Sequence, residues 1–275
     1  MIVKEQYLKS KTHLESDCED SIFVSEHFAA VIDGVTTKST RKYLNETPGR
    51  ACSQLLMKAL EGLPDRSTAK QAVEYLTSSV FSMYNQLGIE ERVLNCPAER
   101  ASAGVVIFSN YRNEIWMVGD CQCMVDKTVY TNAKPIDSLL SDIRSLYIQT
   151  ELKLGKSFDD ILSTDGGREF ILPLLERQHV FQNSFEKNEF TYGVIDGFNV
   201  PESEIKVINL SHPIHLILAS DGYPCLFETL TQSEKYLNEI LKSDPLCFQK
   251  FKSTKGLKPG NSSFDDRAFL RIGME

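Results

Sequence analysis

Short apolar runs that border an acidic residue recur along this 275-residue chain, and they restrict its fold more than any other feature. The runs and their acids are, in chain order, FAAVI before Asp33, EIWMVG before Asp120, HLILAS before Asp221, and RAFLRI after Asp265-Asp266. Short runs of β-branched, aromatic and aliphatic residues bounded by turn residues are typical of buried strands. The pattern therefore predicts several short strands, each with an acid where it reaches the surface.

Segments with helical periodicity separate these strands. Residues 47–62 and 67–88 carry apolar side chains at helical spacing, and the second segment opens with a Ser/Thr cap. Residues 135–177 and 233–242 are predicted to be helical as well. The three apolar runs of residues 102–130 predict an antiparallel meander. The fold class is therefore α+β, with largely antiparallel sheet between helical layers.

Length and composition narrow the function classes. The chain suits one domain, residues 1–275, because sheet-rich domains often reach this size undivided. A formal net charge of -8 and the lack of a basic stripe argue against a nucleic-acid partner. No apolar run approaches the ~20 residues of a membrane helix, and the N-terminus has no apolar signal region, so we expect a cytoplasmic protein without a membrane partner.

The seven cysteines give weak support for zinc chemistry. Their closest spacing is the C-x-C of Cys121 and Cys123, within a predicted strand, and no CxxC occurs. Reduced thiols in a cytosolic protein are the better interpretation.

The first predicted hairpin brings two acids together. If Glu26 and His27 form its two-residue loop, then Asp20 faces Asp33 on the neighbouring strand. Directly opposed side chains have Cβ atoms ~5 Å apart, and like charges so close repel unless a cation lies between them. The register thus predicts a site for divalent ions, although a one-residue slip would remove it.

The other acids repeat this placement at the ends of strands. In an antiparallel sheet, the end of one strand lies beside the start of its neighbour, so Asp120, Asp221 and Asp265 can gather at one edge. Carboxylate oxygens without His or Cys favour Mg²⁺ or Mn²⁺ over zinc. Taken singly, each acid is better explained as a turn residue, because Asp is common in turns at strand ends. Asp-Gly occurs four times in the chain, and the copy at Asp196 has no acidic neighbours that would fit it into a metal site.

Six segments in order resemble the metal-dependent protein phosphatase family, the protein phosphatase 2C type. They are CEDSIFV, AVIDG, ASAGVVIF, WMVGDCQCMV, LILASDGY and SFDDRAFLRI, and they span residues 18–272. The resemblance implies two packed antiparallel sheets between helical layers and a binuclear Mn²⁺ or Mg²⁺ centre at one edge. It also implies hydrolysis of phosphomonoesters, in particular phosphoserine and phosphothreonine of proteins, by a metal-activated water.

The resemblance assigns site residues by position. Asp33 corresponds to the acid that bridges both metals, and Asp221, with Asp33, carries the catalytic role through metal and water. The implied metal-binding set is Glu19 or Asp20, Asp33, the carbonyl of Gly34, Asp221 and Asp265, with Asp120 at a third ion that some members bind.

Several positions depart from the family pattern. Glu15 stands where many members have an arginine that binds phosphate, and Lys9, Lys11 or His13 are nearby candidates for that charge. Val35 follows Asp-Gly where a histidine is common, and Asp266 stands in place of an asparagine. The helical segment of about 135–185 matches the family poorly. Its Arg168, Arg177 and His179 are candidates to face a substrate, but we expect each of them to be exposed to solvent.

Three hypotheses remain open from the sequence. The first is a phosphatase acting on phosphorylated proteins. The second is a pseudophosphatase of the same fold that acts as a binding or regulatory module. The third is a hydrolase of a small phosphorylated molecule, since fold does not fix substrate. The sequence leaves the oligomeric state undecided.

Overall fold

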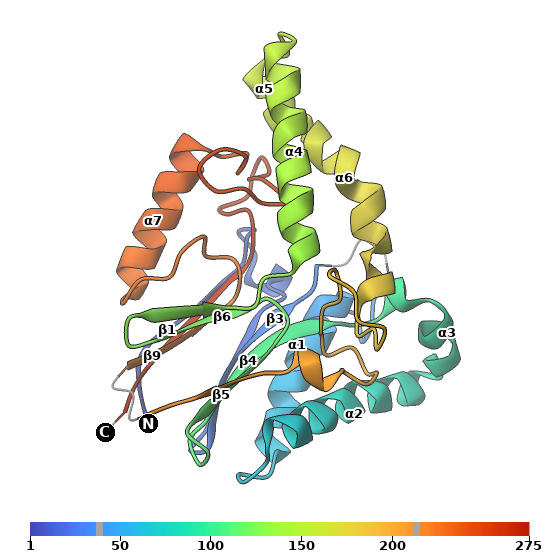
Figure 1. The fold of residues 1–275 in the computed structure, drawn as a ribbon, viewed down its shortest axis with the longest axis vertical. Helices are drawn as coiled ribbons and strands as arrows, with labels where there is room; N and C mark the ends of the chain where they lie inside the picture. The colour runs from blue at the N-terminus through green and yellow to red at the C-terminus, as the bar shows by residue number, and fades with distance from the viewer. Residues whose placement is uncertain (37–40, 212–214, 275) are drawn as a thin grey trace.

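The computed structural model describes residues 1–36, 41–211 and 215–274, and these residues form two five-stranded antiparallel sheets (Figure 1). The first sheet has the order β1 (Ile2–Lys9), β10 (Arg267–Gly273), β9 (His215–Ala219), β6 (Gln122–Val125) and β7 (Thr128–Thr131). The second has the order β2 (Ser21–Val24), β3 (Phe28–Gly34), β4 (Ala103–Ser109), β5 (Glu114–Val118) and β8 (Lys206–Asn209). The predicted α+β class with packed antiparallel sheets is confirmed.

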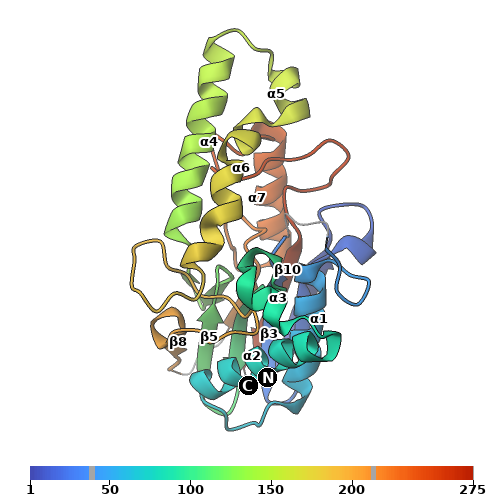
Figure 2. The same cartoon turned by 90° about the vertical axis from the view of Figure 1, so that its right-hand side faces the viewer.

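Helices lie on the outer sides of the two sheets. They are α1 (Pro48–Ala59), α2 (Ala69–Leu87), α3 (Glu90–Asn95), α4 (Pro135–Lys153), α5 (Phe158–Thr164), α6 (Gly166–Arg177) and α7 (Leu230–Ser243). Helices α1 and α2 cover the second sheet, whereas α4, α5 and α6 form an arm that rises away from both sheets (Figure 2). No helix in the described ranges is long and apolar enough to cross a membrane.

Strand alternation builds the layers. On β3, Ala30 and Ile32 pack into the core with α1 and α2, while Ala29 and Val31 pack between the sheets. Successive side chains of a strand point to opposite faces, so a strand that is apolar throughout is buried on both sides. This explains why FAAVI is a continuous apolar run rather than an alternating one.

The hairpin register matches the sequence prediction. Ser21 pairs with Ile32 and Val24 with Ala29, and the loop is closed by the Ser25 N–H, which donates to the Phe28 carbonyl over 2.8 Å. Extending the pairing by one residue places Asp20 opposite Asp33.

Two elements differ from the prediction. Strand β1 was not anticipated, because its residues IVKEQYLK are largely exposed and carry the charges of an edge strand. The meander prediction was wrong at its second turn: β4 pairs with β5, but β6 joins the other sheet beside β9. Gly119, with φ of 86°, lies where the chain crosses between the sheets.

Candidate functional site

The acids singled out in the sequence come together where strand ends of both sheets meet. Glu19 and Asp20 precede β2, Asp33 and Gly34 end β3, Asp120 follows β5, Asp221 follows β9, and Asp265 and Asp266 precede β10. Asp33 interacts electrostatically with Asp20, Asp120 and Asp265, and Asp221 interacts in turn with Asp33. The gathering predicted from strand ends is therefore present.

The electrostatics of the cluster favour an added cation. Burial, and then repulsion from Asp266, raise the pKa of Asp20 well above its ordinary value. Burial and the neighbouring acids also raise the pKa of Asp33 and of Asp221. One oxygen of Asp20, Oδ2, is buried with no hydrogen-bond partner among the described residues. Buried carboxylates without a partner are costly, and a metal ion is one of the groups that can satisfy them.

Close backbone contacts explain why glycine follows Asp33 and Asp221. A Cβ on Gly34 would lie 2.4 Å from the Glu19 carbonyl oxygen, and one on Gly222 would lie 1.9 Å from the Asp266 carbonyl oxygen. The missing side chains thus let the backbone that carries Asp33 and Asp221 approach the backbone of the other acids.

Replacing Gly222 with Ala is expected to destabilise the fold by about 3 kcal/mol, the upper part of the range for overpacking, because backbone must move. Gly166→Ala is the matched control, since its Cβ would approach only the Tyr147 ring, at 3.4 Å, and we expect a change within about 0.5 kcal/mol. Urea denaturation of the two variants measures both effects. Equal stabilities for Gly222→Ala and wild type would contradict the close-approach argument.

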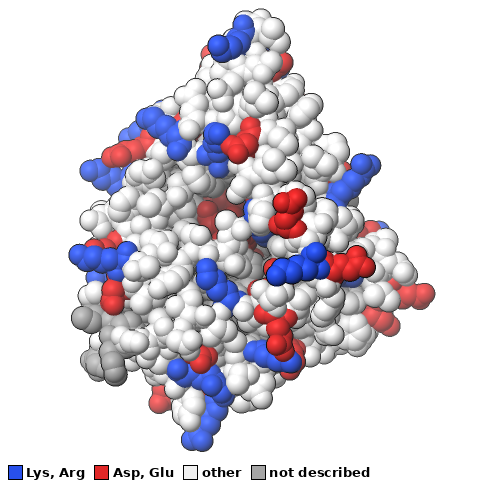
Figure 3. Space-filling view, viewed as in Figure 1, with Lys and Arg blue, Asp and Glu red and all other residues white. Residues whose placement is uncertain are grey.

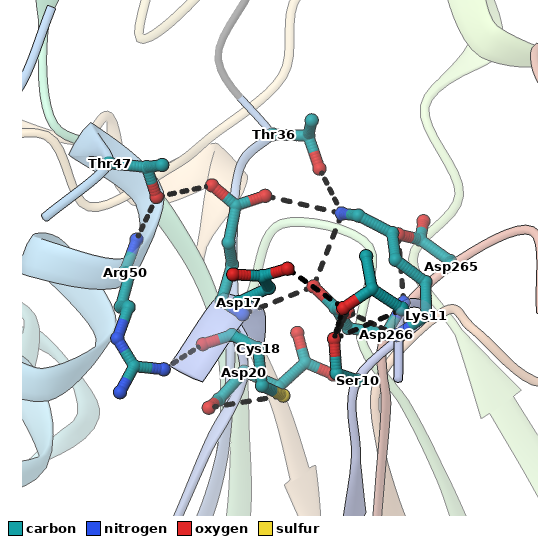
Figure 4. Close-up of polar contacts among 12 residues, drawn as sticks. Ser10, Lys11, Asp17, Cys18, Asp20, Thr36, Thr47, Arg50, Asp265 and Asp266 are labelled. Atoms are coloured by element: carbon teal, nitrogen blue, oxygen red, sulfur yellow. Dashed lines mark hydrogen bonds and ion pairs between the residues drawn. The ribbon is translucent and has the colours of Figure 1, made fainter. Parts of the chain in front are cut away.

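Lys11 lies among three of the acids (Figure 4). Its Nζ is 3.3 Å from Glu19 Oε2, 3.6 Å from Asp265 Oδ1 and 3.2 Å from Asp266 Oδ2, and it also donates to Thr36 Oγ1 over 3.0 Å. Burial opposes the charged form of Lys11, but the acids outweigh burial and raise its pKa. Of the candidates for a local positive charge, Lys11 is the one that enters the cluster.

Two further lysines pair with the cluster from other segments. Lys134, which precedes α4, donates to Asp120 Oδ2 over 2.7 Å, and Lys255 pairs with Asp265. Burial opposes ionisation of Asp265, yet Lys255 and Lys11 lower its pKa. Sequence reasoning missed Lys134 and Lys255, because a lysine in a loop is ordinarily solvated and carries no local signal.

The lysines change how the acids are arranged. Within the described ranges, no three His, Cys, Asp or Glu side chains converge closely enough to hold a metal ion as they stand. Glu19, Asp265 and Asp266 instead converge on the Lys11 ammonium group. The predicted acids are thus brought together, but part of the set faces an internal cation.

The second VIDG segment is not part of this site. Asp196 is fully buried and accepts hydrogen bonds from Arg100, Gln182 and Asn183, and Gly197 has φ of 90°. Asp196 therefore has a structural role in a turn that needs a positive φ.

Five of the seven cysteines are buried, whereas Cys96 is exposed and Cys225 is partly buried. The seven cysteines are free, and Cys121 and Cys123 are both buried in the sheets. Burial, with Asp20 second, raises the pKa of the Cys18 thiol to about 12, so this thiol is inert at neutral pH.

The positions that depart from the family pattern are also visible. Glu15 is exposed in a single 3-10 turn. The side chain of Val35 lies near the acids and has no proton to donate. Arg50 contacts the turn of Glu15: its Nη1 donates to the Glu15 carbonyl over 3.5 Å and to the Cys18 carbonyl over 2.6 Å, and it pairs with Glu46.

A cavity of about 330 Å³ opens above the acids, between the sheets, the arm and residues 251–255. Asp33, Asp120, Asp221 and Asp265 line its floor. Figure 3 shows acidic side chains at the bottom of a hollow below the helical arm. A volume of this size suits a small molecule or one modified side chain.

No family model matches the sequence, and no curated protein matches it. Solved structures do resemble the fold. They include the serine/threonine phosphatase PstP/Ppp of Mycobacterium tuberculosis, with a TM-score of 0.47, 14% identity and 100% of both chains covered. Stp1 from Staphylococcus aureus has a TM-score of 0.47 and 12% identity over 100% of this chain and 96% of that one. PstP in complex with two manganese ions has a TM-score of 0.45 and 15% identity over 99% of each chain. Each of these three structures is named as a serine/threonine phosphatase.

Proposed function

We propose that this chain is a metal-dependent phosphatase that hydrolyses phosphomonoesters, with phosphoserine and phosphothreonine of proteins as its substrates. One observation carries the proposal: acids from four separate segments, Asp33, Asp120, Asp221 and Asp265, meet on the floor of one cavity, in positions that the sequence resemblance assigns to metal ligands. Burying several carboxylates close together costs free energy unless a shared cation offsets their repulsion.

The residues fit divalent ions by charge and by donor type. The seven carboxyl groups of the cluster face three lysine ammonium groups, which leaves an excess of four negative charges when all are ionised. Two divalent ions would offset that excess, and the oxygen-only donors suit Mg²⁺ or Mn²⁺. The unpaired Asp20 Oδ2 is a donor with no other partner in the described residues.

The assignment of ligands follows the sequence positions. Asp33 would contact both ions, with Glu19 or Asp20 and the Gly34 carbonyl at one of them. Asp221 and Asp265 would hold the other ion, and Asp120 a third. When bound, such ions act as Lewis acids that lower the pKa of water and offset charge on phosphoryl oxygens.

The chain's own residues define the rest of the site. Lys134 and Lys255 line the cavity, where they pair with Asp120 and Asp265 of the acidic floor. Val35 cannot donate a proton to a leaving alkoxide, so a solvent molecule must do so if phosphoserine is the substrate.

Addition of Mn²⁺ to the purified, metal-free protein is expected to raise its free energy of unfolding by about 2.7 kcal/mol at 100-fold excess over Kd. Under the same conditions the protein should hydrolyse p-nitrophenyl phosphate and a phosphothreonine peptide. Calorimetric titration and thermal melts measure binding, and product release measures turnover. A protein that binds Mn²⁺ or Mg²⁺ without hydrolysing either substrate would contradict the enzyme assignment.

The contacts of Lys11 favour a second candidate, a pseudophosphatase that acts as a binding module. A lysine that satisfies Glu19, Asp265 and Asp266 can replace a metal ion as the internal cation of the fold. Lys11→Met separates the two candidates in the same Mn²⁺ titration. If wild type binds no Mn²⁺ and the variant does, the module assignment holds; if wild type already binds and turns over substrate, it fails.

A further inference from the structure

The cavity above the acids has a cationic wall as well as an acidic floor. Among the described residues, four basic side chains line it: Lys134, Arg168, Lys252 and Lys255. They come from the start of α4, the first turn of α6 and the loop of residues 251–255, all outside the segments that resemble the phosphatase family.

Three of these four basic groups are already neutralised. Lys134 pairs with Asp120 at 2.7 Å, Lys252 with Asp142 at 2.6 Å, and Lys255 with Asp265. Arg168 differs, because its guanidinium makes no ion pair with a carboxylate of the described residues. Its side chain makes one hydrogen bond to the described residues, from Nη1 to the Thr254 carbonyl over 2.8 Å.

Arg168 is held in this position by its own helix. Asp165 caps α6, and its Oδ1 accepts the backbone N–H of Arg168 over 3.1 Å. The side chain is half-buried rather than exposed, so the expectation of exposure was wrong for Arg168, whereas Arg177 on the same helix is exposed. Burial also lowers the pKa of Arg168, so its charged form lacks part of the solvation that a bound anion could replace.

A phosphate in this cavity needs such a group. The position that the resemblance gives to a phosphate-binding arginine is the exposed Glu15, while Lys11 and Arg50 are occupied by carboxylates and a carbonyl. An acidic floor repels an anion unless cations face it. The planar guanidinium fork matches two phosphate oxygens at once, which a lysine cannot do.

We propose that Arg168 binds the phosphate oxygens of the substrate, and that the helical arm thereby supplies the phosphate-recognition group which the N-terminal segment lacks. The proposal rests on the proposed function for the identity of the substrate as a phosphate monoester. Arg168 reaches the cavity from α6, whereas the acids of the floor reach it from the ends of strands.

The test is binding of inorganic phosphate, measured by titration calorimetry with and without Mn²⁺. Arg168→Gln keeps a donor for the Thr254 carbonyl but loses the charge, and we expect its phosphate Kd to rise about 10- to 100-fold. Arg168→Lys keeps the charge without the fork, and we expect an intermediate Kd. Arg177→Met is the matched control, because it removes an exposed arginine of the same helix, and its Kd should equal that of wild type.

Two readouts separate substrate binding from a structural role. With p-nitrophenyl phosphate, loss of the guanidinium should raise KM more than it lowers kcat, and thermal melts should place Arg168→Gln near wild type. Phosphate affinity that is unchanged in Arg168→Gln, or equally weak in the Gln and Lys variants, overturns the proposal, as does a wild type that binds no phosphate.

The outcomes also distinguish this proposal from the proposed function. If wild type binds phosphate through Arg168 but hydrolyses no substrate, the enzyme assignment fails and the proposed role of Arg168 holds. If wild type hydrolyses phosphomonoesters and Arg168→Gln does so with the same KM, Arg168 fails and the enzyme assignment stands.

Discussion

Asp33→Asn is expected to lower the hydrolysis of p-nitrophenyl phosphate by about 10³-fold, because metal ions supply several kcal/mol of transition-state stabilisation and each 1.36 kcal/mol is tenfold in rate. Asp33 lies near the end of β3 and interacts electrostatically with Asp20, Asp120, Asp221 and Asp265, so its charge acts on four other acids of the cluster. The amide keeps the shape of the side chain but removes its charge. Initial rates over a range of Mn²⁺ concentrations measure the loss.

The same variant should be no less stable than wild type when metal is absent. Removing one of several repelling carboxylates relieves like-charge repulsion, and we expect a gain of about 1 kcal/mol, or roughly 2–4 °C in Tm. Mn²⁺ should then raise the Tm of wild type and not that of Asp33→Asn. Asp159→Asn, an exposed acid on α5, is the control and should behave as wild type in both assays. If Asp33→Asn keeps more than a tenth of the activity, Asp33 is not central to the site.

The hairpin and the acid positions could be predicted from sequence because their signals are local. The apolar run of FAAVI fixes a strand buried on both faces, and the pairing of Ser21 with Ile32 follows once Glu26 and His27 are placed at the turn. The end of each strand then restricts the acid that follows it to a few positions at the edge of the sheet. The glycines were harder to interpret, because Gly34 and Gly222 look like turn residues until the facing carbonyls are known.

The parts that could not be predicted depend on contacts between distant segments. Lys11, Lys134 and Lys255 are ordinary loop lysines in the sequence, and their roles come from acids up to 255 residues away, as in the contact of Lys11 with Asp266. Arg168 was expected at the surface because charged side chains are usually exposed, and its contact with the Thr254 carbonyl joins segments far apart in the sequence. The crossing of β5 to β6 between sheets likewise has no local signal beyond Gly119.

Arg144→Met is expected to cost about 3–5 kcal/mol, because Arg144 is a fully buried cation that joins α4 to the rest of the cavity wall. Its Nε and Nη2 pair with the two oxygens of Asp165 at 3.1 and 2.7 Å, and its Nη1 donates to the carbonyls of Cys247 and Ser253. Methionine would fill the space but leave a carboxylate and two carbonyls without partners. Thermal melts should fall by roughly 10 °C.

The effect should extend to the cavity, since Asp165 caps the helix that presents Arg168 and Ser253 precedes Thr254 and Lys255. Arg144→Met should therefore weaken phosphate binding together with stability, whereas Arg168→Gln should weaken binding alone. A double-mutant cycle with Asp165→Asn isolates the interaction free energy of the Arg144–Asp165 pair. Once the carboxylate is neutral, loss of Arg144 leaves no unpaired charge. The double variant should therefore lose less stability than the sum of the losses in the two single variants. Strict additivity would mean that the Arg144 and Asp165 pair does not hold the arm against the loop, and the cavity wall would then have to be stabilised by the apolar contacts of Ile148, Ile161 and Phe248.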